Sequence, residues 1–226
     1  MTYKEGIYDV RESMKMNSID SDITDRQIAF LMRIYRATVV RQFITNNPGE
    51  HRDMLSQSLY MELELVPKNR FPSYSDSSYT LLSTKLSLPN IIGQQMYKEY
   101  EVRIDDMVGV ELEMIHKDRI VEVRYAPDNF IYGYREDDGK LKFVGKNKQY
   151  KNLTRVVVTA ILENPEDELD INPNMDELVR YPITAHLWAT VKDMIMQQIA
   201  KEMNVPMDLL NDKRDEQSST GAQKQN

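Results

Sequence analysis

The residue types that carry most enzyme chemistry are present in this sequence, but not at catalytic or metal-binding spacings. The three histidines lie in separate segments, and none has a partner at the H-x-x-x-H or H-x-x-E-H spacing of a helical zinc site. We therefore predict no metal site and expect surface or packing roles for His51, His116 and His186. The chain has no cysteine, which excludes thiolate zinc sites, a cysteine nucleophile and a disulfide scaffold.

Nucleotide binding and hydrolysis have no sequence support either. Neither G-x-G-x-x-G nor G-x-x-x-x-G-K-[ST] occurs, and no serine lies in a G-x-S-x-G elbow. Paired carboxylates occur at Asp105-Asp106, Asp137-Asp138 and Glu166-Asp167-Glu168, but adjacent acids in Gly- and Pro-flanked turns are usually solvated rather than held in a cleft. The sequence predicts no catalytic residue and no cofactor, and a small carboxylate enzyme is the least supported function class.

Arginine has the most informative pattern. The stretch "DITDRQIAFLMRIYRATVVRQF", residues 22–43, carries Arg26, Arg33, Arg36 and Arg41 and no carboxylate after Asp25. On a helical wheel one side is an apolar stripe, made of Ile28, Leu31, Met32, Tyr35 and Val39. The arginines lie opposite this stripe, with Arg36 at its margin, and share their face with Phe30, Ala37, Val40 and Ile44.

A mixture of arginine with aromatic and aliphatic side chains is typical of protein interfaces, whereas a solvated helix face interleaves acids with bases. Three interpretations remain open: packing on the chain's own loop or sheet, simple exposure, or a subunit interface. Because the whole chain has a net charge of −7, acidic protein is a better partner for these arginines than DNA. The segment Glu163 to Arg180, with seven acids and one base, is the obvious candidate.

Our interface hypothesis places the arginine face of one copy against an acidic surface of the next, in a heterologous contact that closes into a ring. The predicted interface residues are Arg26, Phe30, Arg33, Arg36, Val40, Arg41 and Ile44 on the helix, and Glu166, Asp167, Glu168 and Asp170 on the acidic side. The competing hypothesis is a DNA-binding or regulatory protein that uses the helix 25–45. It would need a turn and recognition-helix pair and a basic face, and the sequence supplies only one arginine-bearing helix.

Two helices are predicted ahead of a β-rich region. Apolar spacing of three and four residues predicts a helix over 3–16, and Thr24 with Gln27 forms a capping-box signal for a helix from about Asp25 to Thr45. Alternating segments then predict six or seven strands, starting near Ser58 with "LYMELELVP" and including "DRIVEVRYAP". The Ser-, Tyr- and Pro-rich stretch 67–87 is predicted to be a long loop, and Asp138-Gly139 to be a tight hairpin turn with positive φ.

A long helix from about Ile183 to Met203 is predicted after the strands, and a polar tail follows it. The fold class is therefore α+β, with an N-terminal helix pair, a central antiparallel β-sheet or barrel-like meander, and a long C-terminal helix. We divide the chain into an N-terminal helical segment 1–57, a β-rich segment 58–165, a C-terminal helix 166–210 packing with the N-terminal helices, and a tail 211–226, disordered unless bound. No apolar run is long enough to span a membrane and the first residues lack a signal-peptide core, so we expect a soluble protein.

Several stretches resemble virion structural proteins of tailed phages, especially crAss-like phages of gut Bacteroidota. They are the pattern D-x-x-I-T-D-R-x-I-x-x-x-x-x-x-x-R-A-x-x-x-R-Q over Asp20 to Gln42, "VVVTAILENPED" from Val156 to Asp167, and the later "YPITAHLW" and "PMDLLND". Together they cover about a third of the chain. None of them is a catalytic signature.

The resemblance implies a ring or adaptor protein of the head-to-tail connector, assembled as a twelve-fold ring on the portal protein and bordered by other neck or tail rings. It implies location in the virion, no enzymatic activity, and a C-terminal tail from Asn211 that orders against a neighbouring ring or the portal. DNA would pass through the ring without specific binding. An acidic lumen suits that role, because it repels the phosphate backbone.

Overall fold

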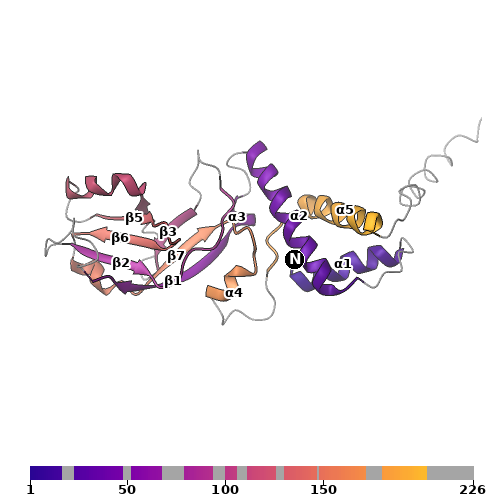
Figure 1. Ribbon diagram of the computed structural model, residues 1–226, viewed down its shortest axis with the longest axis horizontal. Coiled ribbons are helices and arrows are strands. Elements are labelled where there is room, and N and C mark those ends of the chain that lie inside the picture. Colours follow the sequence, from indigo (N-terminus) through magenta and orange to yellow (C-terminus); the bar gives the residue numbers. More distant parts are fainter. Residues whose placement is uncertain are drawn as a thin grey trace, which may run out of the picture. The chain divides into compact units, whose positions relative to one another are not determined.

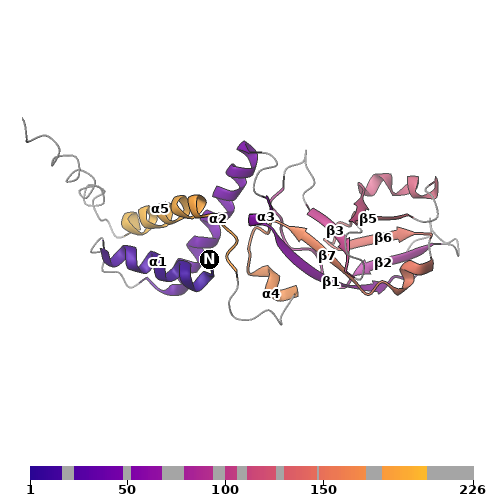
Figure 2. The same ribbon diagram turned by 180° about the vertical axis from the view of Figure 1, so that it is seen from behind.

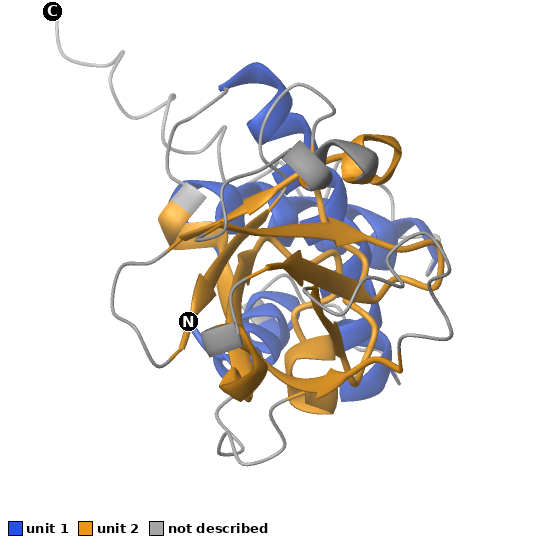
Figure 3. Ribbon diagram, turned by 90° about the vertical axis from the view of Figure 1, so that its left-hand side faces the viewer, with its two compact units in different colours: residues 1–48, 178–226 blue, residues 49–177 orange. Residues whose placement is uncertain are grey.

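The computed structural model describes residues 1–16, 23–47, 52–67, 79–93, 100–105, 111–125, 130–146, 148–171 and 180–202. The chain forms two compact units (Figure 3): unit 1 is Met1–Pro48 with Leu178–Asn226, and unit 2 is Gly49–Glu177. Helices, then strands, then a long helix follow one another, which confirms the predicted α+β class. Among the described residues no helix is both long enough and apolar enough to cross a bilayer. The predicted polar tail 211–226 lies outside the described residues.

The described part of unit 1 contains three helices that pack on one another, α1 (Tyr3–Met16), α2 (Asp25–Asn46) and α5 (Ala185–Glu202) (Figure 1). The predicted spans of all three helices are confirmed to within two residues. Helix α5 runs antiparallel to α2, because the Tyr35 hydroxyl lies 3.4 Å from Oε1 of Gln198 while the Phe43 and His186 rings meet at 5.5 Å between centroids. The middle helix α2 is therefore contacted from more than one side.

The capping box predicted from Thr24 and Gln27 is present. The Thr24 hydroxyl accepts a hydrogen bond from the Gln27 backbone N–H, and the Gln27 side chain accepts one from the Thr24 backbone N–H. These two bonds satisfy backbone donors that the first helical turn leaves without intrahelical partners. Arg11 of α1 also donates to the Asp25 carboxylate, so the start of α2 is fixed to its neighbour.

Unit 2 contains a closed seven-stranded barrel, in the order β1-β2-β6-β5-β4-β3-β7 (Figures 1 and 2). The strands are β1 (Gln57–Leu65), β2 (Thr80–Thr84), β3 (Tyr100–Ile104), β4 (Glu111–Met114), β5 (Ile131–Arg135), β6 (Leu141–Gly145) and β7 (Arg155–Ala160). All neighbouring strands are antiparallel except β4 and β5. Unit 2 also contains the short helices α3 (Arg52–Leu55) and α4 (Asp167–Ile171) and the 3-10 helices η3 (Lys117–Tyr125) and η4 (Lys148–Asn152).

The barrel interior is filled by alternate side chains of the strands. Strand β1 shows the pattern most clearly, because Leu59, Met61 and Leu63 are buried while the residues between them are exposed, as the alternating sequence predicts. The absence of a side chain at Gly133 leaves room inside the barrel for Met114 and Phe143. A Cβ at this position would clash with both, at 2.4 Å from Sδ of Met114 and 2.9 Å from the Phe143 ring. The core residues are Leu59, Met61, Leu63, Leu82, Leu88, Val102, Ile104, Leu112, Ile131, Leu141, Phe143, Val156, Val158, Ala160 and Leu162.

The stretch 67–87, predicted to be one long loop, contains strand β2, so that prediction is wrong for its second half. Strand β2 pairs with β1 on one side and β6 on the other, and all five of its residues are buried. Two of its polar side chains are satisfied locally: the Ser83 hydroxyl donates to the Thr84 carbonyl, and the Thr84 hydroxyl accepts from the Leu141 N–H and donates to the Leu86 carbonyl. Residues 68–78 of the predicted loop lie outside the described residues.

The segment "DRIVEVRYAP", predicted to be a strand, is also different in the structure. Residues 117–125 form the 3-10 helix η3. Ile120 and Val123 are three residues apart, which places them on one side of a 3-10 helix, and both pack on a small second cluster outside the barrel with Leu81, Tyr134 and Val144. The apolar spacing therefore serves a helix that covers the outer face of β2, β6 and β5.

The predicted hairpin at Asp138-Gly139 is confirmed and joins β5 to β6. Gly139 has φ of 80°, and the bonds from Gly139 N–H to the Glu136 carbonyl and from Glu136 N–H to the Lys140 carbonyl close the turn. This pairing leaves three residues in the loop, the arrangement of a type I turn followed by a glycine bulge. A residue with a Cβ would be strained at position 139.

Candidate subunit interface

Helix α2 is buried over a wider arc than one apolar stripe requires. Buried positions spread over roughly half of the wheel at 100° per residue, and Ala37, Val40 and Ile44 on the predicted arginine face are among them. Of the predicted stripe, Leu31 and Tyr35 are only half-buried. The buried residues are Ile28, Met32, Arg36, Ala37, Val39, Val40 and Ile44. Val40 and Ile44 are therefore part of the chain's own packing and are not available to a second copy in this conformation.

Arg36 also belongs to the chain's own packing, because none of its surface is exposed. Its Nε donates to the Pro182 carbonyl at 3.0 Å, and its guanidinium lies 5.9 Å from the centre of the Tyr181 ring. Burial lowers the pKa of Arg36 from its usual value. The aromatic face and the carbonyl replace part of the hydration that the charge loses.

Tyr181 and Trp188 connect Arg36 to helix α1. The Tyr181 hydroxyl donates to the Met32 carbonyl at 2.8 Å, and the Tyr181 ring meets the rings of Tyr3 and Trp188 edge to face. Trp188 Nε1 and Lys192 Nζ both donate to Asp9 of α1. Burial alone would raise the pKa of Asp9, but the bonds from Lys192 and Trp188 outweigh it and leave the pKa below the usual value.

Five other residues of α2 form a set that we call the α2 strip: Arg26, Phe30, Ile34 and Arg41, which are exposed, and Arg33, which is half-buried. Phe30 is 51% exposed and Ile34 is 42% exposed, one helical turn apart. The guanidinium of Arg33 lies 5.4 Å from the centre of the Phe30 ring. The sequence prediction missed Ile34, although its spacing of four residues from Phe30 places it on the same face.

Some of the acids predicted to lie in the interface accept hydrogen bonds within unit 2. Nε2 of Gln57 in β1 donates to Glu168, and Asn164 donates to Asp167 ahead of the short helix α4. Glu166, Asp167 and Glu168 are half-buried, and Asp170 is exposed. Residues 172–179, the rest of the acidic segment, lie outside the described residues. The interface roles of these acids and of the α2 strip stay predictions.

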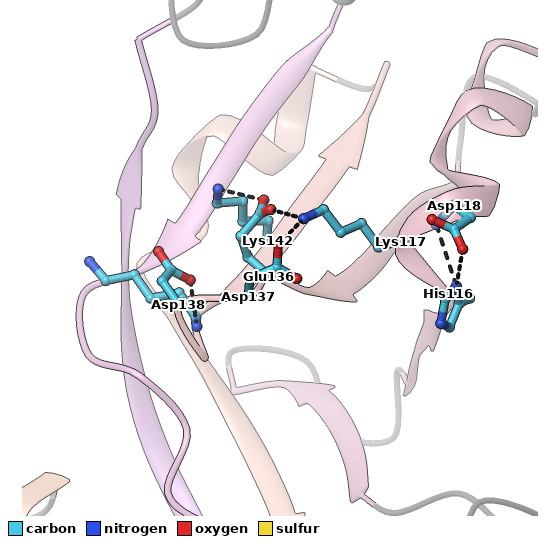
Figure 4. A network of polar contacts seen from close by, with 8 residues as sticks. His116, Lys117, Asp118, Glu136, Asp137, Asp138 and Lys142 are labelled. Atoms are coloured by element: carbon cyan, nitrogen blue, oxygen red, sulfur yellow. Dashed lines mark hydrogen bonds and ion pairs between the residues drawn. The ribbon is translucent and has the colours of Figure 1, made fainter.

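The carboxylates of the β5–β6 hairpin form a charge-paired network rather than an acid–base pair (Figure 4). Glu136 lies between Lys117 and Lys142, at 2.6 Å and 2.7 Å from their Nζ atoms, and Lys117 also binds Asp137. The hydrogen bonds from Lys117 and Lys142 lower the pKa of Glu136. A carboxylic general acid near neutral pH needs a raised pKa, so the lowered pKa of Glu136 fits a structural role in the hairpin.

The two described histidines have packing or pairing partners. His186 on α5 faces Phe43 and lies 3.1 Å from the Thr184 hydroxyl, and exposed His116 pairs with Asp118 at 3.1 Å. No group of three or more potential metal-binding side chains occurs among the residues that the structure describes. His51 lies outside them.

Comparison with known proteins agrees with the ring-forming arrangement that the sequence suggests. The family model described as "Phage tail ring protein 2" matches residues 5–219 of the chain, which covers both units. The chain is also 30% identical over 169 residues to "Ring protein 2" of Bacteroides phage crAss001, an alignment that covers 74% of this chain and 73% of the relative. The chain therefore belongs to the phage tail ring protein 2 family, and it is a structural ring component of a phage virion.

Proposed function

We propose that the chain forms a homo-oligomeric ring in the neck of the virion, where it links the portal and capsid to the tail and surrounds the DNA channel. The family match over residues 5–219 carries this proposal, because it spans nearly the whole chain and names a tail ring. The partners are other copies of the chain, the portal protein and neighbouring neck or tail rings. The stoichiometry that we propose is twelve copies, the number implied by the resemblance to connector rings.

The charge of the chain suits a channel through which DNA moves. A net charge of −7 disfavours tight contact with phosphates, so DNA can pass without being held. The alternative, a DNA-binding protein that uses α2, has less support. Arg36 is buried and Arg33 lies beside Phe30, so the four arginines of the helix do not form one phosphate-binding face.

Electron microscopy of the particle tests this function directly. We expect density for a ring of this chain between portal and tail, and we expect particles made without the gene to have heads that lack attached tails. Absence of the chain from purified virions, or a strictly monomeric chain in the particle, would overturn the proposal. A gel-shift assay with duplex DNA in low and moderate salt distinguishes the ring protein from the alternative, because a DNA-binding protein would retard the duplex at both salt concentrations.

A further inference from the structure

We propose that the α2 strip of one copy binds the acidic unit 2 of the neighbouring copy, in a heterologous contact repeated around the ring. This inference rests on the proposed ring and names the surface that builds it. The strip consists of the exposed residues Arg26, Phe30, Ile34 and Arg41 and of half-buried Arg33, all on helix α2.

The apolar part of the strip is a pair of neighbouring side chains rather than a single exposed residue. Single exposed apolar residues are normal on soluble proteins, and Tyr8 on α1 is one of these. Phe30 and Ile34 differ, because they are neighbours at a spacing of four residues and the Arg33 guanidinium lies beside the Phe30 ring. Aromatic and arginine side chains at the centre of a patch are the residues that most often carry binding energy.

The charge of the two units identifies the partner. Unit 1 contains 13 basic and 12 acidic side chains, whereas unit 2 contains 16 basic and 24 acidic ones. Apart from buried Arg36, helix α2 carries Arg26, Arg33 and Arg41, and it has no acid after Asp25. Contact between unit 1 of one copy and unit 2 of the next therefore brings opposite charges together.

A symmetric contact between two α2 strips is disfavoured by the same charges, because it would place Arg33 and Arg41 of both copies close to one another. A heterologous contact also fits the assembly, since rings are generated by interfaces in which different surfaces of each copy meet. A standard interface buries about 800 Å² on each partner. The strip therefore forms the centre of a larger contact, and Asp170 on α4 is an exposed acid of unit 2 that can meet its arginines.

Site-specific photo-cross-linking tests the partner without assuming which part of unit 2 is touched. Phe30→p-benzoyl-phenylalanine keeps an exposed aromatic side chain at the centre of the strip. Rings assembled from mixed isotopically light and heavy chains are irradiated, and cross-linked peptides are identified by mass spectrometry. We expect peptides from residues 49–177 of a different chain. Tyr8→p-benzoyl-phenylalanine is the matched control and should give few cross-links between chains.

Every other result at position 30 overturns the inference. Cross-links within one chain, to residues 1–48 of another chain, to a different virion protein or to DNA would each assign the strip to another partner. An intact ring with no cross-link from position 30 would show that the strip faces solvent. Failure of the chain to form any ring in the particle would instead overturn the proposed function.

Substitution provides a second measurement. Phe30→Ser with Ile34→Ser should reduce ring assembly by roughly tenfold or more, because both side chains lie at the centre of the contact. Arg33→Glu with Arg41→Glu should do the same by placing acids against acids. Tyr8→Ser and Lys201→Glu are the controls, since they make comparable changes at exposed positions of α1 and α5. Unchanged Trp188 fluorescence and circular dichroism must accompany the loss, and assembly equal to the control variants would contradict the inference.

Discussion

At the scale of single residues, Arg36 shows how a charged side chain can be a core residue. The sequence places it at the margin of the apolar stripe of α2, and the structure surrounds it with Tyr181, the Pro182 carbonyl and the helices of unit 1. A charge buried in this way is costly unless polar or aromatic groups replace water. Its role is therefore to join α2 to the segment that leads into α5.

Arg36→Ala should destabilise unit 1 by about 2–5 kcal/mol, the range for truncating a large buried side chain. Arg36→Met, which keeps most of the volume, should cost less. The chain contains a single tryptophan, Trp188, which lies in unit 1, so the midpoint of its fluorescence change in denaturant reports this unit. Gln42→Ala at an exposed position of the same helix is the control and should stay within about 0.5 kcal/mol of the wild type. Equal effects of Arg36→Ala and Gln42→Ala would contradict the structural role.

Glu136 should make the stability of the barrel depend on acid. Its pKa is lowered in the folded chain by Lys117 and Lys142, so its contribution is complete above its usual pKa of 4.5 and is lost as the pH falls through the lower folded value. Its side chain is 18% exposed and that of Lys142 is 15% exposed, so solvent screens the pair only partly. Glu136→Gln should cost about 1–2 kcal/mol at pH 7 and remove this part of the acid dependence.

Circular dichroism in denaturant, measured from about pH 3 to pH 7, tests this prediction. Trp188 lies in unit 1, so its fluorescence serves as an internal reference that Glu136→Gln should not change at neutral pH. Asp118→Asn at an exposed position is the matched control. A variant whose stability falls with acid as steeply as that of the wild type would exclude Glu136 as the source.

At the scale of elements, the start of α2 depends on its capping box. Thr24→Ala removes the hydroxyl that accepts from the Gln27 N–H and should destabilise unit 1 by about 1 kcal/mol. Thr45→Ala changes the same residue type near the end of the same helix, where the hydroxyl bonds only within the helix, to the Arg41 carbonyl, so it should have a smaller effect. Trp188 fluorescence in denaturant measures both variants. A larger loss from Thr45→Ala would show that the cap is not the important contact.

The helices could be predicted from sequence because local signals define them. The capping pair at Thr24 and Gln27 and the regular apolar spacing place α1 and α2 almost to the residue. The strand β2 could not be predicted in this way, because "TLLST" follows a loop-like composition and its burial comes from β1 and β6, which are distant in sequence. The helix η3 was missed for a related reason: its apolar residues fit a strand equally well until the outer face of the barrel is known.

The candidate interface shows the same limit. A helical wheel separates the two faces of α2 but does not say how many helices pack on it. Since α1 and α5 both contact α2, the buried arc widens to include Val40 and Ile44, and the exposed apolar pair becomes Phe30 and Ile34. From the sequence, Arg26, Arg33 and Arg41 could be placed opposite the apolar stripe, whereas the burial of Arg36 follows from its contacts with residues 181 and 182.

At the scale of the whole molecule, the charge difference between the two units favours a contact between unit 1 of one copy and unit 2 of the next. Unit 2 carries all of the excess negative charge, and the α2 strip carries arginine next to apolar surface. Like charges would oppose a contact between two copies of unit 2. A ring in which unit 1 of each copy meets unit 2 of the next uses both features, and the remaining acidic surface is left for the channel or for neighbouring rings.

Association between copies should therefore weaken with salt without disappearing. The Debye length falls from about 10 Å at 0.1 M salt to about 3 Å at 1 M, so the attraction between the arginines and unit 2 is screened, while the burial of Phe30 and Ile34 is not reduced by salt. Sedimentation velocity of the full chain, over a series of concentrations at both salt levels, measures the change. The double variant Phe30→Ser with Ile34→Ser should lose the association that remains in 1 M salt. Association of the wild type that is unchanged or stronger in 1 M salt would show that opposite charges do not hold neighbouring copies together.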